Sequence, residues 1–449
     1  MLSVCLYFHV HQPYRVGPYR IFDIGNKHDY FNYRGEGNLN NEWVLKKVAG
    51  KCYRPAGELF LELLGKHPEL KLSFSFSGVA LEQMEAWAPD VLEIYKKMIK
   101  TKRVEIVGET YYHSLAYFYS LPEFERQIEE HARLIKRIFG VAPTKTLRNT
   151  ELSYTNSLAA WAANKKYKAV LMEGWEPILE WRAPTYVYKP PQGNIALLLK
   201  HYKLSDDIAF RFHDPSWAGW PLTADKFAHW VHAYHGNGTL VNLFLDYETF
   251  GEHKWAETGI FEFVRYLPGA LLSHPDTDFV TTSEAASRYK PAGVVDVPHV
   301  ISWADTDRDL SAWMGNDLQK SALHDTYALE EKVIATGDDA IIGDWRKLQT
   351  SDHFYYMCTK WWNDGDIHAY FNPYESPYNA YIAIRNALTD LSLRVAEAPK
   401  RGSIIVRKET AIQKNVPTPK SLMVRKVAKK PVVVKVRAVK RKNITKKKV

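Results

Sequence analysis

The densest cluster of reactive side chains in this sequence is Asp246, Glu248, Glu252 and His253, which lie within eight residues of one another. They follow residues 240–245, an apolar and partly β-branched run that predicts a short buried strand. An α/β barrel presents its chemistry in this way, with acids and histidines in the loops at the C-terminal ends of buried strands. Because Asp246 comes at the end of the strand, we expect it to be held more rigidly than the two glutamates of the loop.

Two histidines, His9 and His11, come at the end of the first predicted strand, residues 3–10. Alternate residues of a strand face the same side, so both histidines point in one direction, toward the interior or the loops of a barrel. Three uses are open to such a pair: ligands of a metal ion, hydrogen-bond donors to sugar hydroxyls, or packed core and capping residues. The pair alone does not choose among them.

Glu109 and His113 follow another predicted strand, residues 104–107, and Glu151 lies between a short extended stretch and a predicted helix. The dipole of that helix would favour a carboxylate at its start even without chemistry. Two carboxylates at different strand ends are nevertheless the pair that cleaves glycosidic bonds. One acid protonates the leaving oxygen, and the other attacks the sugar or activates water. Spacing alone leaves open which two acids form the pair.

Aromatic residues make up 13% of the chain, with 14 Trp and 27 Tyr. Such rings pack protein cores, and they also bind sugars, because the C–H face of a sugar stacks on a ring while its hydroxyls form hydrogen bonds at the edge. Together with the carboxylates at predicted strand ends, this composition points to a carbohydrate-active enzyme.

The net charge of +9 hides two parts of opposite sign. Residues 401–449 contain 17 basic residues and one acidic residue, whereas residues 1–400 contain 43 basic and 50 acidic residues. Any attraction for a polyanion therefore belongs to the tail and not to a catalytic cleft. The tail has no aromatic residue and three prolines. We expect it to be a disordered appendage that either contacts a polyanion or stays solvated.

The three cysteines, Cys5, Cys52 and Cys358, lie far apart, and no CxxC motif occurs. This pattern supports neither a disulfide framework nor a zinc finger and predicts reduced, buried thiols in a cytoplasmic protein. The first residues read as a strand and lack the basic region of a signal peptide. No run approaches the roughly 20 apolar residues that a membrane span needs. The sequence leaves the oligomeric state open.

Strand-like and helix-like segments alternate over about the first 285 residues, which implies a parallel sheet and favours a barrel. The predicted strands are residues 3–10, 72–76, 104–107, 169–172, 195–199, 240–245 and 279–281. The predicted helices between them are residues 54–66, 80–101 with an interruption at Pro89, 122–139, 157–164, 224–234 and 259–267. After Pro298 the pattern becomes helical, over residues 306–336, 340–362 and 378–395.

Five stretches in this order resemble the sequence regions of glycoside hydrolase family 57, and most closely those of its α-amylase group. The matching stretches are His11-Gln12-Pro13, residues 73–78 (SFSFSG, the least distinctive), 146–154 (TLRNTELSY), 246–253 (DYETFGEH) and 302–316 (SWADTDRDLSAWMGN). Together the five regions cover nearly the whole chain up to about residue 396, without the tail. Five ordered matches are far more specific than any one of them.

The resemblance implies an α/β fold with three parts. An incomplete (β/α)7 TIM-like barrel (residues 1–298) is followed by a small C-terminal helical domain that completes the cleft (299–396) and by a disordered basic tail (397–449). The implied activity is retaining cleavage of α-1,4-glucosidic bonds in starch or glycogen, so the implied partner is an α-glucan polysaccharide or a maltooligosaccharide. No metal and no other cofactor is expected.

The resemblance also implies roles for single residues. Glu151 falls at the nucleophile position of the family and Asp246 at its general acid/base position. His11, Gln12, His113, Glu248 and His253 are expected to bind the substrate or to support the site, and Trp303 and Trp313 are expected to wall the cleft. Core packing is the plain alternative for both tryptophans.

Three other functions remain open at this stage. A 4-α-glucanotransferase or a glucan branching enzyme of the same family would use the same carboxylates with a sugar as acceptor. A metal-dependent deacetylase or mannosidase would bind zinc through His9, His11 and an aspartate, with water as the nucleophile. A non-catalytic protein would bind α-glucans without turning them over.

Overall fold

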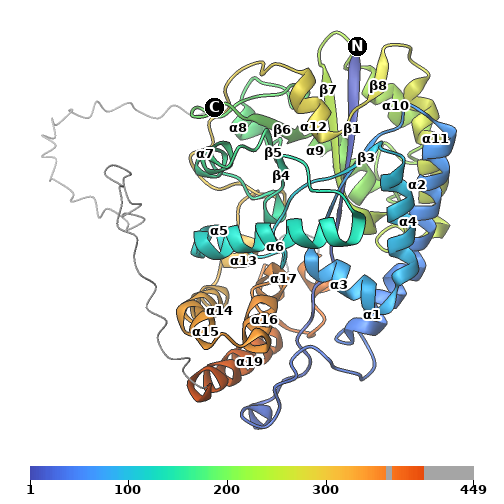
Figure 1. Cartoon of the computed structure of the whole chain (residues 1–449). Coiled ribbons are helices and arrows are strands. Elements are labelled where there is room, and N and C mark those ends of the chain that lie inside the picture. Colours follow the sequence, from blue (N-terminus) through green and yellow to red (C-terminus); the bar gives the residue numbers. More distant parts are fainter. Residues whose placement is uncertain (361–366, 399–449) are drawn as a thin grey trace, which may run out of the picture. The chain divides into compact units, whose positions relative to one another are not determined.

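The computed structural model of the protein describes residues 1–360 and 367–398 (Figure 1). Within these residues, strands run over β1 (Leu2–Val10), β2 (Leu72–Phe76), β3 (Val104–Ile106), β4 (Thr146–Leu147), β5 (Ala169–Glu173), β6 (Ala196–Lys200), β7 (Leu240–Asp246) and β8 (Thr277–Phe279). All the pairs that they form are parallel. The predicted strands recur within two residues at each end, and only the two-residue strand β4 was not predicted as a strand.

The strands form two sheets that join into a ring. One sheet has the order β3-β2-β1-β7, with β8 beside the start of β1, and the other has the order β4-β5-β6. The amide of Gly108 donates to the carbonyl of Thr146 over 3.1 Å and connects the end of β3 to β4. The amide of His201 donates to the carbonyl of Asn242 over 2.8 Å and connects β6 to β7. The seven strands β1 to β7 therefore enclose an interior in the manner of an incomplete barrel.

Strand β1 alternates between two environments. Leu6 and Phe8 belong to the hydrophobic core between the sheet and the outer helices. Cys5 and Tyr7 belong to a separate core cluster inside the barrel, where the ring of Tyr7 packs edge-on to that of Phe244. Successive side chains of a strand point to opposite faces, so His9 continues the inward series.

Strand β7 carries the same alternation. Its residues Leu243 and Leu245 pack in the outer core, whereas Phe244 lies in the inner cluster. Asp246 is next in the inward series, at the C-terminal end of the strand, where it pairs in register with His9 of β1. The alternation of the two strands thus places an acid and an imidazole side by side at the mouth of the barrel.

Helices cover the outside of the ring and follow it in the chain. The helices up to β8 are α1 (Asn41–Val48), α2 (Arg54–Lys66), α3 (Gly78–Trp87), α4 (Pro89–Lys100), α5 (Ala116–Tyr119), α6 (Leu121–Phe139), α7 (Asn156–Asn164), α8 (Glu176–Leu179), α9 (Tyr202–Asp206), α10 (Ala224–His232) and α11 (Ile260–Leu272). Figure 1 shows α2, α4 and α11 beside the sheet that contains β1. The predicted helix at residues 80–101 is two helices, because Pro89 begins α4.

The helices after β8 are α12 (Thr282–Arg288), α13 (Ser311–Met314), α14 (Asp317–Ala328), α15 (Glu330–Thr336), α16 (Asp339–Lys347), α17 (Ser351–Tyr355), α18 (Ile367–Phe371) and α19 (Pro377–Glu397). Side chains of α13 to α17 and of α19 share a continuous hydrophobic core with the second sheet, whereas Ala285 of α12 packs in the inner cluster. The long helices predicted at residues 306–336 and 340–362 are thus divided. Asn316 caps α14 at a break in the first, and the second is interrupted between Lys347 and Ser351. The boundary between a barrel domain and a helical domain at residue 298 stays a prediction.

Several other expectations can be compared with the described residues. The three cysteines are free and buried. Among the described residues, no helix is both long and apolar enough to cross a membrane. Of the expected disordered tail, residues 397–449, positions 399–449 lie outside the described residues, and Glu397 is the last residue of α19.

Candidate active site

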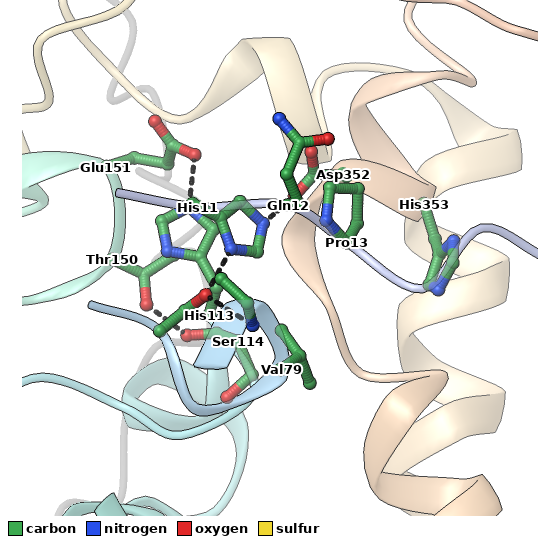
Figure 2. Close-up of polar contacts among 12 residues, drawn as sticks. His11, Gln12, Pro13, Val79, His113, Ser114, Thr150, Glu151, Asp352 and His353 are labelled. Carbon is green, nitrogen blue, oxygen red and sulfur yellow. Dashed lines mark hydrogen bonds and ion pairs between the residues drawn. The ribbon is translucent and has the colours of Figure 1, made fainter. Parts of the chain in front are cut away.

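The C-terminal ends of the strands bring together the polar clusters that the sequence indicated. Asp246 ends β7, His9 lies near the end of β1 and His11 just after it, Glu109 and His113 follow β3, and Glu151 follows β4. Figure 2 shows His11 and His113 side by side, with Glu151 hydrogen-bonded to one ring and Asp352 to the other. The structure therefore gathers residues that are more than 200 positions apart in the chain into one site.

Glu151 is held by two donors, one on each carboxylate oxygen. His113 Nε2 donates to Oε1 over 2.7 Å, and Trp303 Nε1 donates to Oε2 over 2.7 Å. The side chain is 17% exposed, so the carboxylate lies at the edge of solvent in a fixed orientation. Trp303, which the sequence suggested as a cleft wall, thus contacts Glu151 itself.

The backbone at Glu151 is strained. Glu151 has φ 59° and ψ 28°, and Leu152 has φ 51°, the left-handed region that side chains other than glycine rarely adopt. Such conformations cost on the order of 1–3 kcal/mol each and persist where the surroundings fix them, often at functional sites. Here Ser153 Oγ donates to the carbonyl of Thr150 over 2.6 Å, and Asn149 Nδ2 donates to Ser153 Oγ over 2.9 Å. This turn aims the carboxylate into the barrel mouth.

Asp246 and Glu151 are connected through a chain of buried polar groups. His9 Nδ1 lies 3.2 Å from Asp246 Oδ1, and His9 Nε2 lies 3.2 Å from Glu109 Oε2. The same oxygen of Glu109 is 3.7 Å from His113 Nδ1, and the other nitrogen of His113 bonds Glu151. Glu109 is fully buried, so it forms a fixed negative centre between the two imidazoles.

The imidazoles of His9, His11 and His113 stack against one another. The ring centroids of His11 and His113 are 4.1 Å apart with an interplanar angle of 28°, and those of His9 and His113 are 4.9 Å apart with an angle of 24°. A stack of flat rings leaves little freedom for any one of them to rotate. The rings thereby fix the hydrogen bonds that they make to Asp246, Glu109, Glu151 and Asp352.

The two histidines of this stack that contact Glu151 and Asp352 differ in charge. Burial alone would lower the pKa of His113, but the hydrogen bonds to Glu109 and Glu151 outweigh burial and raise the pKa to about 9. The ring is therefore an imidazolium at neutral pH. Burial and the neighbouring charge of His113 lower the pKa of His11 to about 4, against the opposing effect of Asp352. The neutral His11 ring is placed between Ser77 Oγ at 2.6 Å and Asp352 Oδ2 at 2.9 Å.

Both candidate catalytic carboxyls are ionised in the free protein. Burial raises the pKa of Glu151, but the hydrogen bond and charge of His113 bring it below the ordinary value of 4.5. Desolvation raises the pKa of Asp246, but the hydrogen bond and charge of His9 bring it below 3.8. The side chain of Asp246 is 46% exposed, so a molecule that covers it would remove water and raise its pKa.

Glu248 lies behind the site and does not face it. Its Oε1 accepts hydrogen bonds from Tyr53 Oη at 2.5 Å and from the amide of His11 at 3.2 Å, so the side chain supports the backbone after β1. Burial and the charge of Asp246 raise the pKa of Glu248 to about 8. Glu252, in the same loop, forms an ion pair with Lys47 at 2.8 Å.

Replacing Glu248 by Gln is expected to flatten part of the pH dependence of stability. A carboxyl with a pKa of about 8 in the folded protein and 4.5 in the unfolded chain stabilises less and less as the pH rises through this interval. Gln is neutral at every pH and keeps an oxygen for Tyr53. In thermal unfolding at a series of pH values from 5 to 9, the wild type should lose more Tm than Glu248→Gln. Parallel curves would contradict the raised pKa.

Three of the residues expected to bind the substrate or to wall the cleft are buried or half-buried. Trp313 is 2% exposed and packs in the second core, with its ring 5.7 Å from that of Tyr355, so it is a core residue and not part of the cleft wall. Gln12 is buried, and its side-chain oxygen accepts from Arg15 over 3.2 Å. His253 is half-buried, with its ring 5.5 Å from that of Phe371.

A buried network of four charges holds Trp303 from behind. Lys200 Nζ lies 2.9 Å from Asp206 Oδ1 and 3.3 Å from Glu173 Oε2. Arg308 lies 3.1 Å from Asp206 and donates to the backbone carbonyl of Trp303. Two positive and two negative groups balance, which is the condition for burying them without an uncompensated charge. The network fixes the indole that donates to Glu151.

Two groups of side chains have the donor types that metal ions bind: His9, Glu109 and His113, and His11, His113 and Asp352. The first group already contains a cation, because Arg148 Nη1 lies 3.6 Å from Glu109 Oε2 and 3.2 Å from His113 Nδ1. In the second group, His113 Nε2 already bonds Glu151, and His11 bonds Ser77 and Asp352. These residues satisfy one another by hydrogen bonds, an arrangement that fits a polar network around the carboxyls.

Sequence reasoning did not assign Glu109, Arg148 and Asp352 to the site. Glu109 and Arg148 lie inside clusters that the sequence singled out, but nothing in their spacing distinguishes a buried charge from a solvated one. Asp352 comes from α17, about 340 residues after His11, with which it pairs. Its only signal is the polar run Thr350-Ser351-Asp352-His353 at the start of a short helix.

Comparison with known proteins relates this chain to a family. The chain is 41% identical over 401 residues to a protein of Methanocaldococcus jannaschii named "Putative alpha-amylase", an alignment that covers 87% of this chain and 84% of the relative. A structure titled as a branching enzyme from Thermococcus kodakaraensis superposes with a TM-score of 0.61 at 14% identity, covering 89% of this chain and 92% of the other.

A structure titled as an alpha-amylase from Thermotoga maritima superposes with a TM-score of 0.57 at 14% identity, covering 88% of this chain and 93% of the other. At these identities the superpositions establish the fold alone. They confirm the α/β fold with an incomplete (β/α)7 barrel and C-terminal helices. Residues 5–298 match the sequence pattern of glycosyl hydrolase family 57. This match, together with the relative at 41% identity, shows that the chain belongs to that family.

Proposed function

We propose that this protein is a retaining glycoside hydrolase that cleaves α-1,4-glucosidic bonds in α-glucans of the starch and glycogen type, with Glu151 as nucleophile and Asp246 as general acid/base. The observation that carries the proposal is the pair of carboxyls at the barrel mouth, joined by the chain His9, Glu109 and His113. Family membership and the relative named "Putative alpha-amylase" support the substrate class.

The first step is the formation of a covalent intermediate. Asp246 donates its proton to the glycosidic oxygen while a carboxylate oxygen of Glu151 attacks the anomeric carbon, and the leaving sugar departs with the proton. The donors His113 and Trp303 hold Glu151 in one orientation before the substrate arrives. Such pre-positioning supplies part of the rate, because no entropy is lost in orienting the nucleophile during the reaction.

The second step releases the sugar. Asp246, now a carboxylate, takes a proton from a water molecule, which attacks the anomeric carbon and displaces Glu151. Two inversions at the same carbon restore its original configuration. Double displacement requires the two carboxyl groups to be about 5–5.5 Å apart. If a sugar hydroxyl replaces the water, the same two steps transfer a glucan chain and do not hydrolyse it.

Asp246 needs a proton to begin the first step, although its pKa is lowered in the free protein. Substrate binding supplies the change that is needed. A sugar over the half-exposed carboxyl removes its water, and the negative charge of Glu151 in the same dry cleft raises the pKa of Asp246 further. Glu151 keeps its charge because His113 and Trp303 stay bonded to it.

Replacing Glu109 by Gln is expected to lower kcat about 10- to 100-fold, which is the effect of losing one buried hydrogen bond between charged groups. Without the negative charge, the pKa of His113 should fall from about 9 toward its ordinary value. The variant should then lose activity at a lower pH on the alkaline side than the wild type. Activity profiles of both proteins from pH 5 to 10 check this. A uniform loss at every pH would assign Glu109 a packing role only.

The proposed function is tested by incubating the protein with soluble starch and with maltooligosaccharides of defined length and resolving the products. Hydrolysis gives shorter sugars, whereas transfer also gives longer ones. Glu151→Gln serves as the inactive control. A second arm of the experiment adds a metal chelator. The chelator should abolish the activity of a zinc-dependent deacetylase or mannosidase and leave the activity of the proposed hydrolase unchanged. No product from properly folded protein would overturn the proposal in favour of a non-catalytic glucan-binding protein.

A further inference from the structure

An open groove on the barrel, apart from the residues around Glu151 and Asp246, is rich in aromatic side chains. It has a volume of about 670 Å³ and is lined by residues that include Tyr202, Asp207, Arg211, Trp217, Trp230 and Tyr234. These come from α9, from the turn of helix η4 (Asp207–Arg211), from the loop that follows it and from α10 with its C-terminal turn. The volume lies within the range of about 300–1,000 Å³ that small-molecule sites occupy.

The rings of the groove are fixed in place. The centroids of Trp217 and Trp230 are 5.8 Å apart and their planes are inclined by 75°, so the two indoles form adjacent walls. Both indoles are half-buried and pack against the hydrophobic core beneath the groove. One part of each ring is therefore anchored and another part faces solvent. A rigid aromatic surface of this kind binds the C–H face of a sugar with little loss of side-chain entropy.

Polar groups lie at the edges of these rings. Arg211 Nε donates to Asp207 Oδ1 over 2.7 Å, and Arg211 Nη2 donates to the carbonyl of Lys203 over 3.1 Å. The guanidinium carbon of Arg211 is 5.7 Å from the centroid of Trp217. A carboxylate and a guanidinium held beside an aromatic face offer an acceptor and donors to the hydroxyls of a stacked sugar.

The groove is linked to the catalytic residues through a single arginine. The guanidinium carbon of Arg308 lies 5.5 Å from the ring centroid of Tyr202, in the groove. The same guanidinium donates to the backbone carbonyl of Trp303, whose indole donates to Glu151. The groove and Glu151 are therefore connected by one series of contacts, through Arg308 and Trp303.

We propose that the groove is a second α-glucan-binding site, which holds one segment of a polymeric substrate while another segment lies between Glu151 and Asp246. This inference rests on the proposed function for the class of sugar. The alternative occupant within the chain, the basic segment 401–449, would bring 17 basic residues to a groove whose one lining acid, Asp207, already pairs with Arg211. A sugar chain is uncharged and needs no acidic partner.

The test compares polymeric and short substrates in variants of the groove. Trp230→Ala and Trp217→Ala remove the two walls, and Tyr266→Ala is the matched control, since Tyr266 is an exposed aromatic residue on the neighbouring helix α11. Both groove variants should lower kcat/KM on soluble amylose about threefold or more, the size of a lost stacking contact. With maltotriose, which the proposal expects to occupy the catalytic residues alone, they should match the wild type and the control.

Equal activity of wild type, control and groove variants on amylose would overturn the inference while leaving the proposed hydrolysis intact. Absence of activity on any glucan in the wild type would instead refute the proposed function. Because both tryptophans also pack against the core, a second measurement uses the unaltered groove. In Glu151→Gln protein, maltoheptaose should protect residues 202–234 from hydrogen exchange and leave α11 unchanged. Protection confined to the loops around Glu151 and Asp246 would equally overturn the inference.

Discussion

Glu151→Gln is expected to lower kcat on α-glucans by about 10⁴-fold or more, while the protein stays folded. The amide has the same size as the carboxylate and is a far weaker nucleophile, so the glycosyl-enzyme cannot form. Its oxygen can still accept the hydrogen bond from His113, but its NH₂ group then faces the N–H of Trp303, which donated to the second carboxylate oxygen. We therefore expect a small loss of stability together with the nearly complete loss of turnover.

Rates of product formation from maltooligosaccharides and Tm values for both proteins check this prediction. Glu252→Gln is the matched control, because Glu252 lies in the loop after β7 and pairs with Lys47 away from the imidazole stack. The control should keep most of its activity. If Glu151→Gln retained more than a few per cent of the wild-type rate, Glu151 would not be the nucleophile, and another acid would have to supply it.

Asp246→Asn is expected to lower kcat on α-glucans by about 10²- to 10⁴-fold, the usual contribution of a general acid/base. Unlike the loss of a nucleophile, this defect should depend on the leaving group. A maltosyl fluoride leaves without protonation, so the first step should proceed at nearly the wild-type rate and the covalent intermediate should accumulate. A small anion such as azide needs no general base, and it should then release the sugar as a glycosyl azide.

This dependence on the leaving group separates an acid/base from a residue that only shapes the site. Burst kinetics with maltosyl fluoride and mass spectrometry of the intact protein measure the two effects. His9 bonds Asp246 over 3.2 Å and an amide can still accept that bond, so the geometry of the site is kept. A variant that is equally impaired with starch and with the fluoride would show that Asp246 does not act by proton transfer.

Part of the site could be predicted from the strands that carry it. The apolar run before Asp246 predicted a buried strand with this acid at its end, and the structure adds that Leu243 and Leu245 face the outer helices and Asp246 the interior. Alternation along the first strand placed His9 and His11 on one side. Alternation and strand ends are local properties of the sequence, and this part of the prediction needed no knowledge of distant residues.

The parts of the site that depend on distant contacts could not be predicted in this way. Glu109 and Asp352 are carboxylates in polar stretches, and only the folded chain shows that one is fully buried between two imidazoles and that the other pairs with His11. Trp313 illustrates the opposite error. Its motif suggested a cleft wall, yet the short helix α13 directs its ring into the core. A helix of four residues is too short for its sequence to show which side is buried.

In the loop after β7, a glycine is required by a close contact with a distant part of the chain. Gly251 has φ 114°, and a Cβ at this position would lie 2.0 Å from the carbonyl oxygen of Lys51. No other residue fits there, because both the backbone conformation and the space exclude a side chain. The sequence showed the glycine among the acids, and only the packed structure gives the reason for it.

The configuration of the first product tests the account most directly. The wild-type protein is incubated with maltopentaose in an NMR tube, and the anomeric signals of the new reducing ends are followed before mutarotation equalises them. Double displacement through Glu151 with Asp246 as acid/base predicts that the α-anomer appears first and that Glu151→Gln yields neither anomer. Initial release of the β-anomer would show inversion by a single displacement and would contradict the assignment of Glu151 as a covalent nucleophile.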